Sequence, residues 1–94
     1  MQEFIGRHQP DVLARAITTL ESCSDEDVAG QAHRLAGTLG TYQLDDAQRT
    51  CRDLEAVAKT GDSSRMSASR RTTLDMLRII AAELAAGRGE EAHT

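Results

Sequence analysis

The chain has 94 residues, of which 39% are hydrophobic, 28% are charged and only 2% are aromatic. Because a domain usually contains about 100–200 residues, we expect a single domain, and the composition is typical of a helical bundle rather than of a disordered chain. The formal net charge of −4 argues against a general nucleic-acid-binding protein, since such proteins bind phosphates through clustered lysine and arginine.

The sequence has no pattern typical of a membrane span or a signal peptide. No run approaches the roughly 18–20 apolar residues that cross a bilayer, and residues 1–20 lack the basic-then-apolar order of a signal peptide. We therefore expect a cytoplasmic protein. Cys23 and Cys51 form neither a C-x-x-C pair nor a disulfide framework, and both fall on or beside apolar helical positions. Their pattern favours buried free thiols over a disulfide.

Apolar residues that recur at three- and four-residue steps predict four amphipathic helices and no strand. The first helix begins near Pro10, a residue suited to a first helical turn, and ends near Ser22. Its apolar positions are Leu13, Ile17 and Leu20. Phe4 and Ile5 precede this helix, and we expect them to fold back over one end of the bundle.

The second helix is predicted to begin at Ser24, whose hydroxyl caps it while Asp27 and its acidic neighbours face the positive helix end. Its apolar positions are Val28, Ala32, Leu35 and Leu39. The third helix follows Asp45 and Asp46 and ends near Lys59, with Gly61 just beyond it. Its inward positions are Ala47, Cys51, Leu54 and Ala58.

The fourth helix is predicted to end near Gly87, which leaves residues 88–94 as a polar tail. Its candidate capping residues are Asp62, Ser63 and Ser64. Its apolar positions are Met66, Thr73, Leu77, Ile80 and Leu84. Short connections make sequential helices pack side by side, so residues 1–87, with a core of 10–87, are expected to form an all-α, antiparallel up-down-up-down four-helix bundle. A short N-terminal helical segment is compatible with this fold.

His33 lies in the second predicted helix, and the residues on its own face are small. Its neighbours three and four positions away, and the glycine one turn further, are Ala29, Gly30, Ala36, Gly37 and Gly40. A glycine inside a helix costs about 0.8–1.0 kcal/mol relative to alanine, so three of them destabilise this helix by about 2–3 kcal/mol. Because these neighbours have little or no side chain, another macromolecule could bring its own groups close to the His33 ring.

The apolar stripe predicts the orientation of His33. With Ala32, Leu35 and Leu39 taken to face the core, His33 is rotated by about 100° toward the boundary between core and solvent. An exposed histidine ring is partly neutral at neutral pH and then offers one nitrogen lone pair, which can act as a nucleophile or accept a phosphoryl group.

Other interpretations of these residues use different chemistry. The glycines could instead permit close helix packing inside the bundle. A zinc site would have to combine His33 with His8, His93, Cys23 or Cys51. On no predicted helix are these residues spaced as zinc ligands usually are. A hydrolytic site would need a nucleophile and acid–base partners that converge in a pocket, whereas the serines and acidic residues fall mostly at caps and on solvated faces.

The run from Ala32 to Tyr42, followed by Leu44, Cys51, Leu54 and Glu55, resembles the histidine-containing phosphotransfer (HPt) domain of bacterial two-component phosphorelays. The resemblance covers roughly Pro10 to Gly87. The typical core of that family reads Ala-His-x-Leu-Lys-Gly-Ser. This chain matches it at His33, Leu35 and Gly37, with Thr38 in place of the serine.

Two positions depart from the family pattern. Ala36 stands where the family often has a lysine near the phosphoryl oxygens, and Arg34 lies about 100° away around the helix. Gln43 stands where many members have a glycine in the turn after this helix. The first departure concerns the charge near the phosphoryl group, and the second concerns the turn.

The resemblance implies a phosphoryl carrier rather than a self-sufficient enzyme. His33 would be the phosphoacceptor, which takes a phosphoryl group from the aspartyl phosphate of one receiver domain and passes it to the aspartate of another. The residues expected to admit the partner are Gly30, Arg34, Ala36, Gly37 and Gly40. Mg²⁺ and the other catalytic groups would come from the receiver, so no cofactor or metal is expected on this chain.

The partners that the resemblance implies are response-regulator receiver domains and a histidine kinase or hybrid kinase. We expect a monomer that binds neither nucleic acid nor membrane. Two alternatives remain open: a helical interaction or dimerisation module that uses the Gly/Ala face to bind a partner helix, and the dimerisation and phosphoacceptor domain of a sensor kinase. The latter normally has two helices per chain.

Overall fold

The computed structural model describes the backbone of residues 2–93 and the side chains of residues 9–86. Within these residues the chain forms α-helices and one short 3-10 helix, without strands, which confirms the predicted all-α class. The elements in chain order are α1 (Gln2–Ser22), η1 (Asp25–Asp27), α2 (Val28–Thr41), α3 (Asp45–Lys59) and α4 (Ser63–His93).

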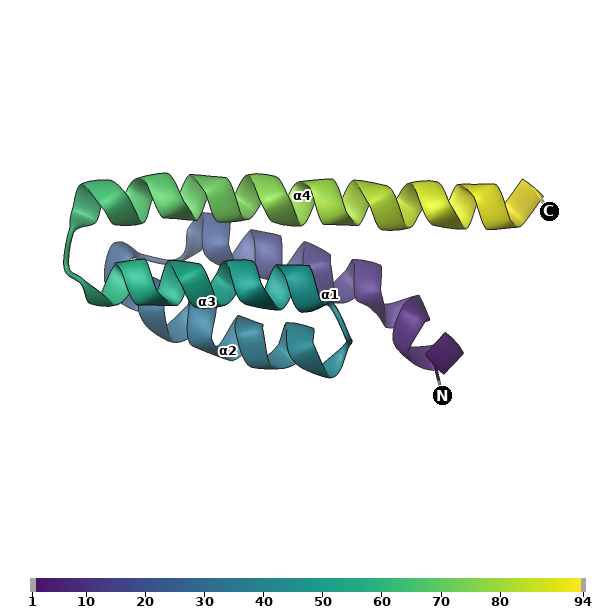
Figure 1. Ribbon diagram of the computed structural model, residues 1–94, viewed down its shortest axis with the longest axis horizontal. Coiled ribbons are helices and arrows are strands. Elements are labelled where there is room, and N and C mark those ends of the chain that lie inside the picture. The colour runs from purple at the N-terminus through teal and green to yellow at the C-terminus, as the bar shows by residue number, and fades with distance from the viewer. Residues whose placement is uncertain (1, 94) are drawn as a thin grey trace.

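The helices pack in a ring, in which each helix contacts two others. α1 contacts both α2 and α4, and α3 contacts the same two helices from the opposite corner. Short turns join successive helices, which therefore run antiparallel (Figure 1). The predicted four-helix bundle is confirmed. None of the helices in the described part is both long enough and apolar enough to cross a membrane.

The start of α1 differs from the prediction. The helix begins at Gln2 rather than near Pro10, and Pro10 lies inside it. A proline within a helix removes one backbone hydrogen bond and bends the helix without always ending it. In Figure 1 the first turns of α1 run at an angle to the rest of the helix. The side chains of Phe4 and Ile5, expected over one end of the bundle, lie outside the described side chains.

The end of α4 also differs from the prediction. The helix continues to His93 instead of ending near Gly87, so residues 88–93 are helical rather than a tail. Each glycine costs a helix only about 1 kcal/mol, and the alanine, glutamate and arginine residues around it are strong helix formers. The last turns of α4 extend past the other helices at the end of the bundle where α1 begins (Figure 1).

The cap predicted at Ser24 has a different form. The short helix η1 separates Ser24 from α2, and its backbone hydrogen bond joins the Asp27 amide to the Ser24 carbonyl at 3.0 Å. The Ser24 hydroxyl donates to Asp27 Oδ2 at 3.0 Å rather than accepting from a backbone amide. By contrast, α4 is capped by Asp62, one of the three predicted candidates, because its Oδ1 accepts the Arg65 amide at 3.1 Å.

The turn between α2 and α3 explains why the departure at Gln43 matters. Gln43 has a φ of 62°, a left-handed conformation that glycine adopts most readily. The Gln43 amide donates to the Gly40 carbonyl at 3.0 Å, and the Leu44 amide donates to the Leu39 carbonyl at 2.9 Å. These two bonds form a Schellman motif, whose usual apolar contact is supplied by the buried Leu39 and Leu44. The turn therefore keeps its geometry with a residue that is strained there.

The core is built from small and aliphatic side chains. Its buried members are Leu13, Ala16, Leu20, Val28, Ala32, Ala36, Leu39, Leu44, Ala47, Cys51, Leu54, Met66 and Leu77. The predicted apolar faces supply most of them. On α2, however, Ala36 is buried while Leu35 is only half-buried, so the buried stripe passes through Ala36.

Both cysteines are free thiols, as predicted, but only Cys51 is fully buried, whereas Cys23 is half-buried. Burial raises the pKa of the Cys51 thiol from its usual 9.0 to about 11, because the core disfavours the thiolate. The folded state therefore holds this proton more tightly than the unfolded state does. Its contribution to stability is complete below pH 9.0 and is lost as the pH rises toward 11.

We expect the free energy of unfolding to fall between pH 9.0 and about 11, with Cys51 contributing about 2–3 kcal/mol of the loss. Denaturant titrations of the wild type and of Cys51→Ala at pH 7, 9 and about 11 would measure it. The variant should start less stable but lose less stability with rising pH. Equal losses in the two proteins would contradict the assignment to this thiol.

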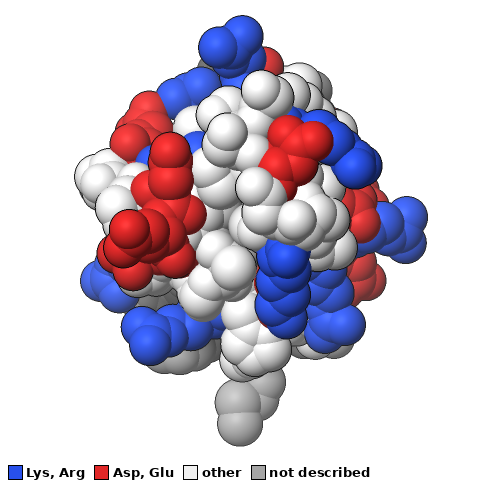
Figure 2. Space-filling model, turned by 90° about the vertical axis from the view of Figure 1, so that its left-hand side faces the viewer, with Lys and Arg blue, Asp and Glu red and all other residues white. Residues whose placement is uncertain are grey.

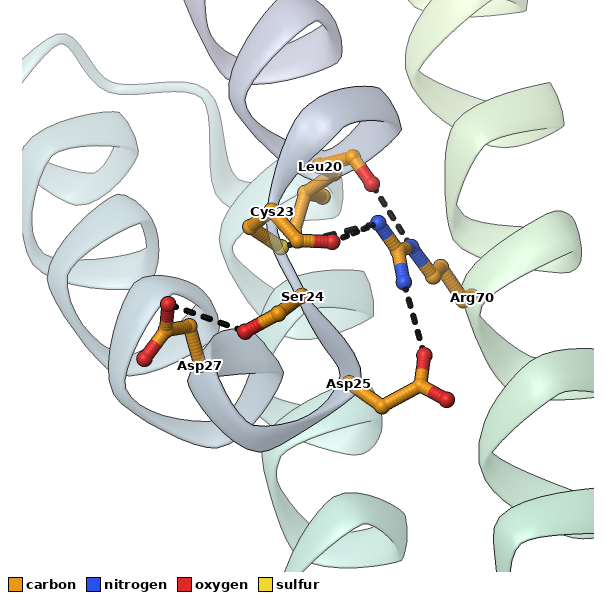
Figure 3. A network of polar contacts seen from close by, with 6 residues as sticks. All are labelled: Leu20, Cys23, Ser24, Asp25, Asp27 and Arg70. Carbon is orange, nitrogen blue, oxygen red and sulfur yellow. Dashed lines mark hydrogen bonds and ion pairs between the residues drawn. The ribbon is translucent and has the colours of Figure 1, made fainter.

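Arg70 of α4 holds the connection between α1 and η1 (Figure 3). Its Nε donates to the Leu20 carbonyl at 2.6 Å, and its Nη2 donates to the Cys23 carbonyl at 2.5 Å. Its Nη1 contacts Asp25 Oδ1 at 3.2 Å. Carbonyl groups at the end of a helix have no partner within the helix, so one guanidinium satisfies two of them and ties α4 to the end of α1.

The end of the bundle seen in Figure 2 carries charges of both signs. Basic and acidic side chains are interspersed there, in several places side by side, around uncharged surface. This face therefore lacks the uniformly basic character of a phosphate-backbone-binding surface.

Candidate functional site

His33 lies on the solvent side of α2, and its side chain is 75% exposed. This exposure follows from the helical pattern, because Ala32 and Ala36 on the neighbouring stripe face the core. The ring is therefore accessible to another molecule, as the sequence predicts.

A carboxylate from α3 holds one nitrogen of this ring. Glu55 Oε2 lies 3.1 Å from His33 Nδ1, and the same oxygen lies 2.8 Å from Lys59 Nζ. The Glu55 side chain is only 14% exposed, so its position is well defined by the packing of α3 against α2. The three side chains form a short chain of polar contacts across two helices.

The charges around Glu55 determine the form of the His33 ring. The hydrogen bond from Lys59 and the charges of Lys59 and His33 lower the pKa of the Glu55 carboxyl below its usual 4.5, so it is ionised at neutral pH. An ionised carboxylate can only accept a hydrogen bond, so Nδ1 must carry the proton. In the neutral ring, Nε2 then holds the free lone pair. The site thus presents a nitrogen nucleophile at Nε2.

A surface hollow lies beside the ring, between α2 and α3. Its lining residues are His33, Ala36 and Gly37 from α2 and Arg52, Glu55, Ala56 and Lys59 from α3. The α2 side is bare, and the α3 side carries two cationic side chains together with the Glu55 carboxylate. A group with negative charge that approached His33 would therefore meet Arg52 and Lys59.

The predicted access residues occupy different places around His33. Gly37 is exposed and lines the hollow, whereas Ala36 lines it with a side chain that is 3% exposed. Gly30 and Arg34 are exposed on α2 but do not line the hollow. Gly40 is half-buried one turn further along the helix. The structure therefore brings Ala36 and Gly37 to His33 and leaves the other three residues outside the hollow.

The glycines test the hypothesis of close packing inside the bundle. A Cβ atom at Gly30 or Gly37 would have nothing within 4 Å, so packing within this chain does not require glycine at either position. A Cβ atom at Gly40 would clash with the side-chain amide of Gln48 on α3. That amide is the far end of a flexible side chain, so an alanine at Gly40 would only require Gln48 to move, and packing within the described residues requires glycine at none of the three positions.

Sequence reasoning did not assign a site role to Glu55 or Lys59. Glu55 was named only as part of the HPt family pattern, and Lys59 was named only as a residue that marks the end of the third helix. The signal that could have found them is the spacing on α3, which places residues 52, 55, 56 and 59 on one helical face. That face becomes part of the site only once α3 is placed beside α2.

Among the described residues, no cluster of three or more histidine, cysteine, aspartate or glutamate side chains is arranged to hold a metal ion. Comparison of the chain with protein-family models, curated proteins and solved structures found no match. The geometry at His33 is therefore the main basis for a functional proposal.

Proposed function

We propose that this chain is a histidine phosphotransfer domain, which relays a phosphoryl group between receiver-domain aspartates in a two-component phosphorelay. The observation that carries the proposal is the exposed His33 ring, whose Nδ1 is held by Glu55 and whose Nε2 is left free. A phosphoryl carrier needs one such nucleophile on a rigid support, because positioning and charge stabilisation supply most of the catalysis of phosphoryl transfer.

Each transfer forms one bond to phosphorus and breaks another. Nε2 of His33 attacks the phosphorus of an aspartyl phosphate on the receiver, the N–P bond forms, and the P–O bond to the aspartate breaks. The aspartate leaves as a carboxylate, and Nδ1 keeps its proton. The ring nitrogens then share a positive charge, which the Glu55 carboxylate stabilises at 3.1 Å. In the second transfer an aspartate of another receiver attacks the same phosphorus and releases the neutral ring.

The partner supplies what this chain lacks. Mg²⁺ and the acidic pocket belong to the receiver, so the chain is a phosphoryl-carrier intermediate of the cytoplasm rather than an enzyme. The bare α2 surface at Gly37 leaves room for the rim of that pocket to approach the ring. The alternative of a partner helix bound to the Gly/Ala face requires no free ring nitrogen and no carboxylate at Nδ1.

A labelling experiment tests the proposal. A panel of receiver domains is phosphorylated with radiolabelled acetyl phosphate, freed of the donor and mixed with this protein and Mg²⁺. We expect acid-labile, alkali-stable label on the chain within minutes from at least one receiver, and loss of that label to a second, unlabelled receiver. If no receiver donates to or accepts from the chain, the relay function is wrong and the interaction module is favoured.

Gly37 distinguishes a docking surface from a structural glycine. Because a Cβ atom there meets nothing, Gly37→Ala should raise the free energy of unfolding by up to about 1 kcal/mol. Gly37→Gln places a long side chain four residues from His33 and should slow phosphoryl transfer at least about tenfold by blocking a face that must meet the receiver closely.

The control for this prediction is Gly30→Gln, on the same helix but outside the hollow. Initial transfer rates and urea titrations would be measured on all three variants. Unfolding of Gly37→Gln would mean that the glycine serves packing, and an unchanged transfer rate would mean that the receiver does not approach over Gly37.

A further inference from the structure

The site must accommodate the negative charge of a phosphoryl group at Nε2. That group carries nearly two negative charges at neutral pH, and the ionised Glu55 lies on the other side of the same ring. A cation near the phosphoryl oxygens would offset this charge. On α2 the nearest position that could hold one on the face of His33 is Ala36, which has no charge.

The register of α3 against α2 places a cation of α3 opposite Ala36. The His33–Glu55 contact pairs the two antiparallel helices at that point. Ala36 comes three residues after His33, and Arg52 comes three residues before Glu55, so these two positions lie level with each other. Both line the same hollow, and the Ala36 side chain is packed in the core, so no side chain from that position of α2 fills the hollow in front of the guanidinium.

The two cations of the hollow differ in what they contact. Lys59 is bound to Glu55 Oε2 at 2.8 Å, on the Nδ1 side of the ring. Arg52 is exposed and takes part in none of the ion pairs found among the described side chains. An unpaired guanidinium is also suited to phosphate, because its planar N–H groups can bind two oxygens at once.

We propose that Arg52 is a phosphoryl-binding residue, whose guanidinium binds the phosphoryl oxygens once Nε2 of His33 is modified. This inference rests on the proposed function and adds to it the source of the stabilising cation. Lys59 has a separate task, which is to keep Glu55 ionised and in place against Nδ1.

The test uses phosphoramidate, a small donor that phosphorylates exposed histidines without a receiver. His8→Gln and His93→Gln are introduced into every protein so that one phosphohistidine remains. The lifetime of phosphorylated His33 is then followed by ³¹P NMR in three proteins of this background: the parent, Arg52→Gln and Arg52→Lys. Arg34→Gln is the matched control, because Arg34 is next to His33 in sequence but outside the hollow.

At low ionic strength, Arg52→Gln should shorten the lifetime about two- to five-fold, as expected for an exposed charge pair, and the difference should vanish in about 1 M salt. It should also raise the pKa of the phosphoryl group, because the cation favours the dianion. Arg52→Lys should retain part of the effect, and Arg34→Gln should show none.

An unchanged lifetime and phosphoryl pKa in Arg52→Gln would overturn this inference, as would a larger effect of Arg34→Gln. Neither result involves a receiver, so neither bears on the relay proposal, which the labelling experiment with receiver domains tests. Conversely, Arg52→Gln could shorten the phosphohistidine lifetime while the labelling experiment shows no phosphoryl transfer to or from any receiver. That result would support Arg52 as a phosphoryl-binding residue and contradict the relay function.

Discussion

Replacement of His33 by glutamine is expected to reduce phosphoryl acceptance from receiver domains by at least about a hundredfold, because the amide has no nitrogen lone pair to attack phosphorus. The fold should be retained, since the side chain is 75% exposed and contacts only Glu55 among the polar groups described. Acid-labile label and the circular dichroism spectrum would be measured on the same preparation.

The controls are His8→Gln and His93→Gln, which should keep the label. Nitrogen-15 NMR of the phosphorylated wild type should place the phosphoryl group on Nε2, because Nδ1 donates to Glu55 at 3.1 Å. Persistent acid-labile label on His33→Gln would show that another residue is the acceptor. Modification of Nδ1 would contradict the role assigned to Glu55.

Replacement of Arg70 by alanine is expected to have the largest effect on stability. The variant loses the bonds to the Leu20 and Cys23 carbonyls, and the Arg70 side chain is only 17% exposed. The two carbonyls are then left without a partner in a half-buried place, and two hydrogen bonds from a charged donor are lost. Together these losses should lower the free energy of unfolding by about 2–3 kcal/mol. For a domain of this size, the melting temperature should fall by about 8–24 °C.

Arg71→Ala provides the matched control, because Arg71 is the next residue on α4 and is exposed. It should change the melting temperature by no more than about 4 °C, as is usual for a surface substitution. Thermal unfolding followed by circular dichroism would measure both variants. Similar melting temperatures for Arg70→Ala and the wild type would mean that water satisfies the carbonyls equally well.

The element boundaries were predicted where local chemistry decides them. α3 was predicted to follow Asp45 and Asp46 and begins slightly earlier, at Asp45, while its predicted end at Lys59 is confirmed and the glycine expected just beyond it, Gly61, has a φ of 81°. Those signals act within a few residues, through charge at a helix end and through the freedom of glycine. The boundaries at Pro10 and Gly87 were wrong because such residues weaken a helix by a limited amount, which neighbouring turns can outweigh.

The candidate site shows the same division between local and long-range effects. The sequence by itself determined the all-α bundle and the exposure of His33, because both follow from periodicity within single helices. Only the tertiary structure decided which groups surround the ring. Glu55 is 22 residues away in the chain, and its contact with Nδ1 depends on the register of α3 against α2. That register is decided by the joint packing of side chains from all the helices, which no single segment encodes.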